Sequence, residues 1–377
     1  MSLTICMTAG TLYYPDGGGN LWLYLNWALS FRSIGCRVIW LEAVHKSTPV
    51  DKLNLLVANL KSRLTPFGLA DNIALWQSDG EFLPHEKLGT CLDVEYAGQQ
   101  SDFLLNQYYA MPATVLQHFP RTALLDIDPG QVQIWVKNGV LKIEKHDFYF
   151  SIGENMLPTY ISSSNTTVSW LHTPPCVSLE AWPVTKAHDD APFTTVSHWY
   201  SAWDEIDGEV YANGKKDGFL PYLELPNYSK KPLELCVYLA EESHEEREML
   251  ENSGWRVAKS NVITSTGAAY QQYIQQSFGE FSCAKPAYVR MQNAWVSDRT
   301  ICYLASGKPV VLQDTGPSSF LPRDEGYLRF NDLAGAIKCI EKVAGDYDKH
   351  CASARALAEA YFDGRKVTTT ILNRIMN

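Results

Sequence analysis

The chain has 377 residues, a length typical of two domains, and 46% of them are hydrophobic, which excludes a disordered chain. The formal net charge is −10. Proteins that bind nucleic acid usually present a Lys/Arg cluster to the phosphates, so this charge predicts that nucleic acid is not a partner. An acidic chain also binds anionic membrane surfaces weakly.

The cysteines and the apolar segments predict a location. The nine cysteines are scattered without CxxC spacing, which is typical of reduced thiols in the cytoplasm. No apolar stretch is long enough for a transmembrane segment, and residues 1–10 lack the basic region of a signal peptide. The histidines show no metal-site spacing. We therefore expect a cytoplasmic protein.

The first predicted elements are a strand, a loop, a helix and a second strand. Residues 3–7 form a short apolar run, and residues 16–20 are a glycine-rich loop. Residues 21–34 are apolar on nearly all sides, which predicts a buried helix, and residues 37–41 are rich in β-branched side chains. This order predicts a parallel sheet.

Polar side chains follow two later strands of the first half. Asp126 and Asp128 lie where the strand at residues 123–126 ends, and Asn155 follows the strand at residues 148–152. Such strand ends line the ligand crevice of doubly wound sheets. We therefore assign Asp126, Asp128 and Asn155 to binding the hydroxyl groups of a ligand. The two aspartates are equally compatible with a metal or with a simple turn before Pro129.

The second half repeats the α/β pattern after a loose segment with several prolines. We place the domain boundary near residues 182–190, which gives domains at 1–185 and 186–350 and a closing helical segment at 351–377. The predicted strands of the second domain are residues 193–198, 233–239, 255–258, 281–284 and 309–312. Its predicted helices are residues 241–253, 268–276, 297–305 and 331–344.

Residues 297–307 predict a short helix suited to a phosphate. Ser297 is a good N-cap and Gly307 a good helix stop. The free N–H groups of a helix start favour an anion. Arg299 opposes the helix dipole, and a bound anion would explain it; Asp298 has the chemistry to hold a ribose diol. The alternative is an ordinary capped helix.

A polar turn follows the next strand. The apolar run at residues 309–312 ends at Gln313, and Asp314, Thr315 and Gly316 come directly after it. Parallel strands present such turns at their carboxyl ends, where ligands bind. We therefore assign Asp314, Thr315 and Gly316 to phosphate or nucleotide binding.

These segments resemble the GT-B glycosyltransferases. Residues 305–311 match the family's small-x-Gly-x-Pro-Val-Val element, and residues 277–281, which include Gly279 and Glu280, match its turn over the donor. The resemblance implies two Rossmann-like α/β domains that face one another across a cleft. It further implies an acceptor in the first domain, which Asp126, Asp128 and Asn155 would bind. It implies a nucleotide-sugar in the second domain and a last segment that crosses back to the first. It implies neither a metal nor another cofactor.

The sequence departs from the retaining members of that family at two positions. Their paired glutamates would fall at Ala294 and Cys302, and neither residue is acidic. Asp298 is our substitute for the ribose-binding carboxylate, and Glu280 is our candidate for contact with the donor sugar. Whether transfer retains or inverts the anomeric configuration stays open.

Loop residues outside this segment complete the predicted site. Gly17, Gly18 and Gly19 permit close approach to a phosphate or sugar, although a flexible turn explains them as well. Asp16 is a candidate general base for an inverting reaction, or a plain loop carboxylate. Lys215 and Lys285 are candidates for the donor diphosphate, although solvated lysines are common.

The sequence therefore predicts a metal-independent glycosyltransferase that moves a sugar from a nucleotide-diphosphate donor to an unidentified acceptor. Two alternatives stay open. One is another sugar-nucleotide enzyme, such as an epimerase. The other is a catalytically silent nucleotide-binding or scaffold protein.

Overall fold

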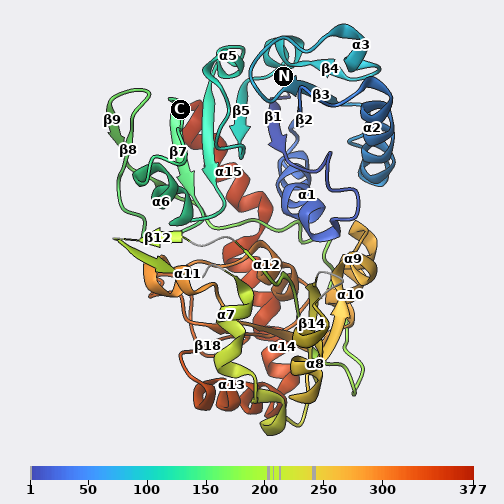
Figure 1. Ribbon diagram of the computed structural model, residues 1–377, viewed down its shortest axis with the longest axis vertical. Coiled ribbons are helices and arrows are strands. Elements are labelled where there is room, and N and C mark those ends of the chain that lie inside the picture. Colours follow the sequence, from blue (N-terminus) through green and yellow to red (C-terminus); the bar gives the residue numbers. More distant parts are fainter. Residues whose placement is uncertain (1, 202–203, 207, 212–213, 240–242) are drawn as a thin grey trace. The chain divides into compact units, whose positions relative to one another are not determined.

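The structure is a computed structural model that describes residues 2–201, 204–206, 208–211, 214–239 and 243–377 (Figure 1). It divides into two compact units, which are unit 1 (Met1–Cys176 with Gly364–Asn377) and unit 2 (Val177–Asp363). The chain passes between the units at two neighbouring points, because Val177 pairs with Asp363 in a parallel bridge. The first passage from unit 1 to unit 2, between Cys176 and Val177, comes before the boundary that the sequence predicted between residues 185 and 186.

Unit 1 contains an eight-stranded parallel sheet with the order β10-β7-β6-β5-β1-β2-β3-β4. Its strands are β1 Thr4–Ala9, β2 Arg37–Val44, β3 Ile73–Gln77, β4 Leu92–Asp93, β5 Phe103–Asn106, β6 Thr122–Asp126, β7 Phe148–Ser151 and β10 Leu171–His172. Its helices are α1 Gly18–Ser33, α2 Val50–Leu64, α3 His85–Leu88, α4 Val94–Gln99, α5 Ala113–Leu116, α6 Gln131–Lys137 and α15 Gly364–Met376. An antiparallel hairpin joins β8 Thr159–Ile161 to β9 Thr166–Val168.

The strand order of unit 1 fixes where its crevice lies. The chain builds outward from β1 through β2 and β3, and then returns to the other side of β1 with β5. A doubly wound sheet binds ligands where the order reverses, outside the carboxyl ends of the strands. In unit 1 this switch point lies between β1 and β5, which pair with Met7 beside Leu105.

Unit 2 contains a six-stranded parallel sheet with the order β15-β14-β11-β16-β17-β18. Its strands are β11 Phe193–His198, β14 Leu233–Tyr238, β15 Arg256–Lys259, β16 Gly279–Ser282, β17 Val310–Gln313 and β18 Tyr327–Phe330, and a hairpin joins β12 Asp204–Ile206 to β13 Glu209–Tyr211. Its helices are α7 Lys215–Phe219, α8 His244–Asn252, α9 Ser260–Ile263, α10 Gly267–Gln276, α11 Pro286–Met291, α12 Asp298–Ala305, α13 Leu333–Gly345 and α14 Tyr347–Leu357. The switch point of this sheet lies between β11 and β16.

Aromatic side chains hold the core of unit 2 together. The ring of Phe281 in β16 stacks on Phe330 in β18, with centroids 5.2 Å apart. Phe219 in α7 packs edge-on against both Phe281 and Trp255. These contacts fix α7 against the sheet and so determine where the start of α7 lies.

The prediction of two Rossmann-like α/β domains is confirmed. The strand at residues 193–198 has the predicted ends, and α1 is buried on most sides as its apolar pattern indicated. The closing segment differs in extent from its prediction: α15 packs against α1 within unit 1, whereas α14 belongs to unit 2. Among the described residues, no helix is long and apolar enough to cross a bilayer.

Candidate functional site

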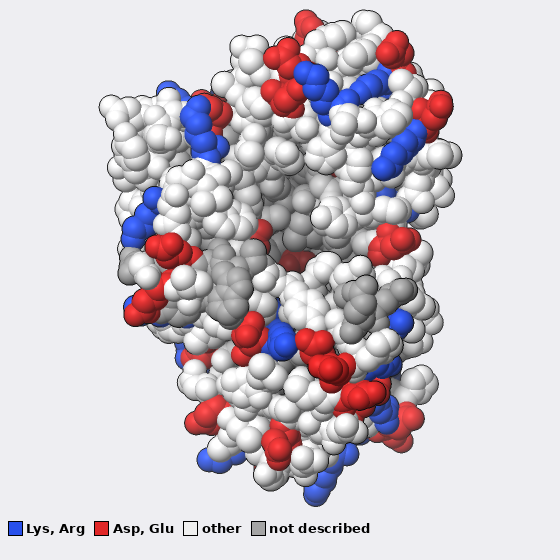
Figure 2. All heavy atoms as spheres, viewed as in Figure 1, with Lys and Arg blue, Asp and Glu red and all other residues white. Residues whose placement is uncertain are grey.

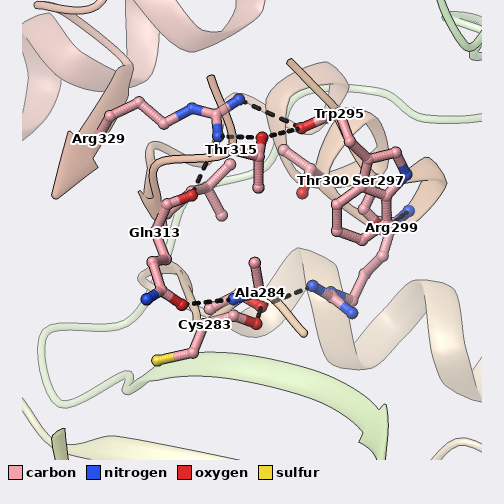
Figure 3. A pocket seen from close by; sticks show the side chains of 11 residues that line it. Cys283, Ala284, Trp295, Ser297, Arg299, Thr300, Gln313, Thr315 and Arg329 are labelled. Carbon is pink, nitrogen blue, oxygen red and sulfur yellow. Dashed lines mark hydrogen bonds between the residues drawn. The ribbon is translucent and has the colours of Figure 1, made fainter. Parts of the chain in front are cut away.

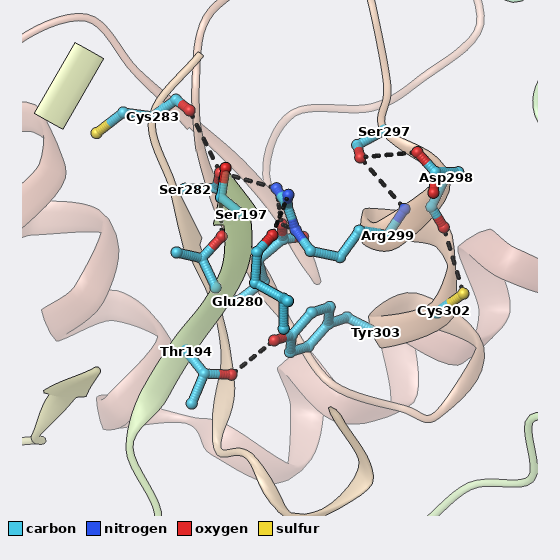
Figure 4. A network of polar contacts seen from close by, with 12 residues as sticks. Thr194, Ser197, Glu280, Ser282, Cys283, Ser297, Asp298, Arg299, Cys302 and Tyr303 are labelled. Carbon is cyan, nitrogen blue, oxygen red and sulfur yellow. Dashed lines mark hydrogen bonds and ion pairs between the residues drawn. The ribbon is translucent and has the colours of Figure 1, made fainter. Parts of the chain in front are cut away.

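A buried ion pair lies at the switch point of unit 2 (Figure 4). Arg299 is in the first turn of α12, and its Nε and Nη2 each lie 2.7 Å from Oε1 of Glu280 in β16. Glu280 has no exposed surface, and Arg299 is 8% exposed. Burial disfavours the charge of Arg299, but the charge and hydrogen bond of Glu280, together with Tyr270 and Tyr303, outweigh burial and hold the pKa of Arg299 above its usual value.

Arg299 also ties together the two strands that flank the switch point. Its Nη1 donates to the carbonyl of Val196 in β11 at 2.9 Å, and its Nη2 donates to Oγ of Ser282 in β16 at 2.9 Å. Ser297 caps α12, since its Oγ accepts from the backbone N–H of Arg299 at 3.2 Å. We explained the cation in this helix turn by a bound anion; the structure supplies Glu280 as its counter-charge.

The prediction that Gly279 and Glu280 form a turn over the donor is wrong. Both residues lie inside β16, and Gly279 pairs with Phe193 near the amino end of the strand, away from the carboxyl-end crevice. A Cβ at Gly279 would lie 2.5 Å from the carbonyl oxygen of Pro309, so close strand packing explains the glycine. Glu280 points to Arg299 within the protein and is not exposed to a donor sugar.

Lys215 is a buried lysine beside the carboxyl end of β16. It is 5% exposed, its Nζ donates to the carbonyl oxygen of Cys283, and it lies 5.7 Å from the ring centroid of Trp295. A glycine makes this position possible, because a Cβ at Gly218 would lie 2.2 Å from the carbonyl oxygen of Ala284. The start of α7 therefore packs directly on the end of β16.

Positive charge accumulates around Lys215. Burial, then the charge of Arg299 and then that of Lys285 together lower the pKa of Lys215 to about 7. Cys283 and Glu280 oppose this shift. Lys285 is half-buried at the start of α11, with its Nζ 5.5 Å from the ring centroid of Tyr288. Because Glu280 already neutralises Arg299, the two lysines add positive charge that this pair does not balance.

A small pocket lies between the start of α12 and the carboxyl ends of β16 and β17 (Figure 3). Its enclosed space of about 20 Å³ is enough for a water molecule. Polar side chains from three strands and α12 line it, among them Ser282, Arg299, Gln313, Thr315 and Arg329.

The polar turn after β17 closes one side of this pocket. Oγ1 of Thr315 accepts from Arg329 Nη1 at 2.9 Å and donates to the carbonyl oxygen of Trp295 at 3.0 Å. Asp314 accepts from the N–H of Gly316 at 3.0 Å and pairs with Arg323 at 2.9 Å. These bonds give the Thr315 and Asp314 side chains structural partners, and their assignment to the donor stays a prediction.

Gly316 and the loop before α12 pack against each other. Gly316 has a φ of 119°, and a Cβ there would lie 2.4 Å from the carbonyl oxygen of Gln292. The N–H of Ala294, which has a φ of 57°, donates to the carbonyl of Thr315 at 2.8 Å. Ala294, where the resemblance would place a glutamate, thus lies in a tight left-handed turn held by the loop after β17. Asp298 is half-buried at the start of α12, and its ribose contact stays a prediction.

In unit 1 the loop after β1 is held by two charged side chains. Glu42 in β2 accepts from the N–H groups of Thr11 and Leu12 at 3.1 and 3.2 Å, and Arg63 donates to the carbonyl of Thr11 at 2.9 Å. Asp16 is exposed on this loop. Gly17 is the N-cap of α1, and Gly18 and Gly19 begin the helix. The catalytic role of Asp16 and the donor contacts of the glycines stay predictions.

The prediction that Asp126 binds the acceptor is wrong. Its carboxylate is completely buried and accepts from the N–H of Asp128 and from side chains of Gln133 and Ser151, each at 3.0 Å. Burial, despite the bond from Gln133, raises the pKa of Asp126 to about 7. Its oxygens are used to join β6, β7 and α6. Asp128 is half-buried and Asn155 exposed, and their acceptor role stays a prediction.

Two groups of site residues were missed by sequence reasoning. Ser282 and Arg329 line the pocket of unit 2, but neither residue lies within a motif that the sequence resembles. Gln107 follows β5 at the switch point of unit 1. This strand of four residues has no recognisable period, so no sequence signal marks the polar residue at its carboxyl end.

Comparison with known proteins relates this chain to solved structures only. No family model and no curated protein matches it. An alpha-glucosyltransferase in complex with UDP shares 11% identity at a TM-score of 0.60, with all of both chains covered. The Anabaena protein HepE in complex with UDP and glucose shares 9% identity at a TM-score of 0.55, with 99% of both chains covered. A glycosyltransferase from Rickettsia africae shares 12% identity at 0.55, covering all of this chain and 99% of the other.

The prediction that excluded nucleic acid is wrong. Alpha-glucosyltransferase structures of the same fold hold DNA, one with an abasic site at 9% identity and a TM-score of 0.59. The overall charge does not exclude nucleic acid, because it is unevenly distributed: unit 1 has 15 acidic residues and 14 Lys/Arg, whereas unit 2 has 27 acidic residues and 18 Lys/Arg. In the view of Figure 2, charges of both signs are interspersed among the described residues. In architecture, the chain resembles the GT-B glycosyltransferases, with the two Rossmann-like domains that its sequence predicted.

Proposed function

We propose that this chain is a glycosyltransferase and that unit 2 holds the diphosphate of its nucleotide-sugar donor. The observation that carries the proposal is the gathering of Lys215, Lys285 and Arg299 at the switch point between β11 and β16, with Glu280 as the buried counter-charge. An uncompensated positive charge at the carboxyl end of a doubly wound sheet is suited to an anionic ligand.

Lys215 is the side chain that we expect to change partner when the donor binds. Its Nζ now donates to a neutral carbonyl oxygen, that of Cys283. A hydrogen bond from a cationic amine to a phosphate oxygen is about twice as strong as one between neutral groups. A diphosphate oxygen near the carboxyl end of β16 would therefore attract Lys215 and restore its full charge.

The same cations serve the chemistry of transfer. As the glycosidic bond breaks, negative charge develops on the diphosphate leaving group, and positioned cations and helix N–H groups stabilise it. Lys215, Lys285 and the start of α12 at Ser297 supply these groups in our proposal, and Asp298 holds the ribose. Metal-independent catalysis, without another cofactor, follows from this assignment and remains a proposal.

UDP-glucose is the donor to test first. The alpha-glucosyltransferase and HepE structures of the same fold hold UDP or UDP-glucose, although their identity to this chain is only 9–11%. The molecules bound beside the nucleotide differ, since some alpha-glucosyltransferase structures hold DNA and a HepE structure holds glucose. Sugars and hydroxymethylated DNA therefore both belong in the acceptor panel.

Release of UDP from UDP-glucose tests the proposal directly. A transferase releases UDP in an amount that rises with the acceptor, and the glycosylated acceptor gains the mass of one hexose. An epimerase converts the donor to an isomeric nucleotide-sugar without releasing UDP. A silent binding protein is stabilised by UDP in a thermal-shift assay but changes neither substrate. Lack of stabilisation by UDP, GDP, ADP and dTDP alike would refute the donor site.

A further inference from the structure

Gln107 is a buried amide that lacks hydrogen-bond partners within the described part of the chain. The residue is 6% exposed, and neither its Oε1 nor its Nε2 has a hydrogen-bond partner there. A buried polar group that has given up water without a replacement destabilises a fold, so native proteins rarely keep one without a use. Here both ends of the amide are in this state.

The backbone around Gln107 is fixed in place. Its own N–H donates to Oγ1 of Thr8 in β1 at 2.6 Å, and the neighbouring Asn106 accepts from the N–H of Tyr108 at 2.8 Å. Asn106 also contacts the ring nitrogen Nε2 of His146 at 3.0 Å. The backbone of Gln107 is therefore held at a defined place, beside Thr8 near the carboxyl end of β1.

A second amide with a buried, unpartnered oxygen occurs on the other side of the same switch point. Asn20 lies in the first turn of α1, which follows β1, and its Oδ1 is buried without a partner among the described residues. Gln107 follows β5, the neighbour of β1 across the switch. Two independent amides with unused hydrogen-bonding capacity thus flank the place where this fold class binds ligands.

We propose that Gln107, together with Asn20, recognises the acceptor in unit 1 through its uncharged hydroxyl groups. An amide offers a donor and an acceptor side by side, which matches a hydroxyl that donates and accepts at once. The proposal rests on the proposed glycosyltransferase function. It moves the acceptor site from the strand end at Asp126 to the β1–β5 switch point, where Asp16 is exposed on the loop after β1.

The test measures binding of two hydroxyl-bearing probes by saturation-transfer NMR with the full chain. The probes are methyl β-D-glucopyranoside and 5-(hydroxymethyl)-2′-deoxyuridine, which represent a sugar and a modified-nucleoside source of the same chemistry. Gln107→Leu replaces the amide with an apolar side chain of similar size. Gln117→Leu, at an exposed position after α5, is the matched control.

We expect wild-type protein and Gln117→Leu to bind at least one probe, and Gln107→Leu to bind it roughly tenfold more weakly, as expected for loss of a neutral hydrogen-bonding group. Equal binding by Gln107→Leu, or binding of neither probe to the wild type, overturns the proposal. UDP binding is measured in parallel and should be the same in all three proteins. Failure of UDP binding would instead refute the donor site.

Thermal unfolding separates recognition from a structural role. An amide without partners contributes nothing to the fold, so Gln107→Leu should unfold at the same temperature as the wild type or higher. A clear decrease in the unfolding temperature, absent in Gln117→Leu, would show that the amide is bonded within the protein and would contradict the proposal.

Discussion

Oε1 of Glu280 in β16 lies 2.7 Å from Nε of Arg299 in α12, and both side chains are buried. The two opposite charges compensate each other. The ion pair joins β16 to α12 below the loops at the carboxyl ends of the strands. Arg299 binds Ser282 and the carbonyl of Val196. Lys215, in contrast, is a buried cation that donates to a neutral carbonyl oxygen. The structure thus gives Arg299 a supporting role, and our proposal assigns the ligand to Lys215.

Arg299→Ala should destabilise the protein. Removing one member of a buried ion pair leaves the other charge without compensation, which typically costs about 3–5 kcal/mol. We expect a lower unfolding temperature for unit 2 in calorimetry. The double variant Glu280→Leu/Arg299→Met removes both charges and should recover much of that loss. An Arg299→Ala protein as stable as the wild type would show that the pair does not hold the two elements together.

UDP binding should weaken as the pH rises through about 7, because burial lowers the pKa of Lys215 to about 7. A phosphate partner favours the protonated amine and raises its pKa, so this contribution is complete below pH 7 and is lost above it. The amine of Lys215 is surrounded by the same groups whether or not UDP is bound, namely Arg299, Lys285, Glu280 and Cys283.

Titrations of wild-type and Lys215→Met protein from pH 6 to pH 9 measure this effect, since UDP's own ionisation is common to both. The ratio of the two affinities should fall as the pH rises. The wild type should also take up a proton on binding near pH 8, seen as a dependence of the binding enthalpy on the buffer. A constant ratio would remove Lys215 from the site.

Gly218→Ala should weaken UDP binding more than it weakens the fold. A Cβ at this position would meet the carbonyl oxygen of Ala284 at 2.2 Å, so the start of α7 must move away from β16. Lys215 moves with it. We expect affinity to fall by about tenfold, which corresponds to 1.4 kcal/mol. Gly345→Ala is the control, because its Cβ would meet nothing within 4 Å.

Stability of unit 1 should carry a pH dependence from Asp126. Burial raises its pKa to about 7, whereas an unfolded aspartate titrates near 3.9. The folded state therefore binds the extra proton between these values, and stability falls as the pH rises from about 4 to about 7. Asp126→Asn should flatten that slope in urea unfolding, whatever its effect at one pH. An unchanged slope would assign the dependence to another group.

The sequence was sufficient for the class of fold and for most of unit 2. Strand 193–198 was predicted with the ends that β11 has, and the capped helix at 297–305 matches α12 Asp298–Ala305. Both have clear signals, namely a β-branched run and a serine cap with a closing glycine. The same local signals predicted that unit 1 is a parallel sheet.

The contacts of the candidate sites were not available from local patterns. Arg299 appeared to need an anion because its carboxylate lies 19 residues away on another strand. β5 Phe103–Asn106 is only four residues long, too short for a period to be recognised, and without it the strand order of unit 1 was unknown. For that reason the sequence favoured Asp126 for the acceptor, whereas the strand order makes Gln107 our candidate.

Calorimetric titration of UDP into wild-type, Lys215→Met and Lys230→Met protein at pH 7 tests the central claim most directly. Lys230 is an exposed lysine before β14, so Lys230→Met makes the same substitution as Lys215→Met at a position away from the proposed site. We predict that UDP binds the wild type and Lys230→Met alike and binds Lys215→Met at least about tenfold more weakly, as loss of a charge-assisted hydrogen bond requires. Equal affinity for UDP in all three proteins would contradict the assignment of the donor diphosphate to this site.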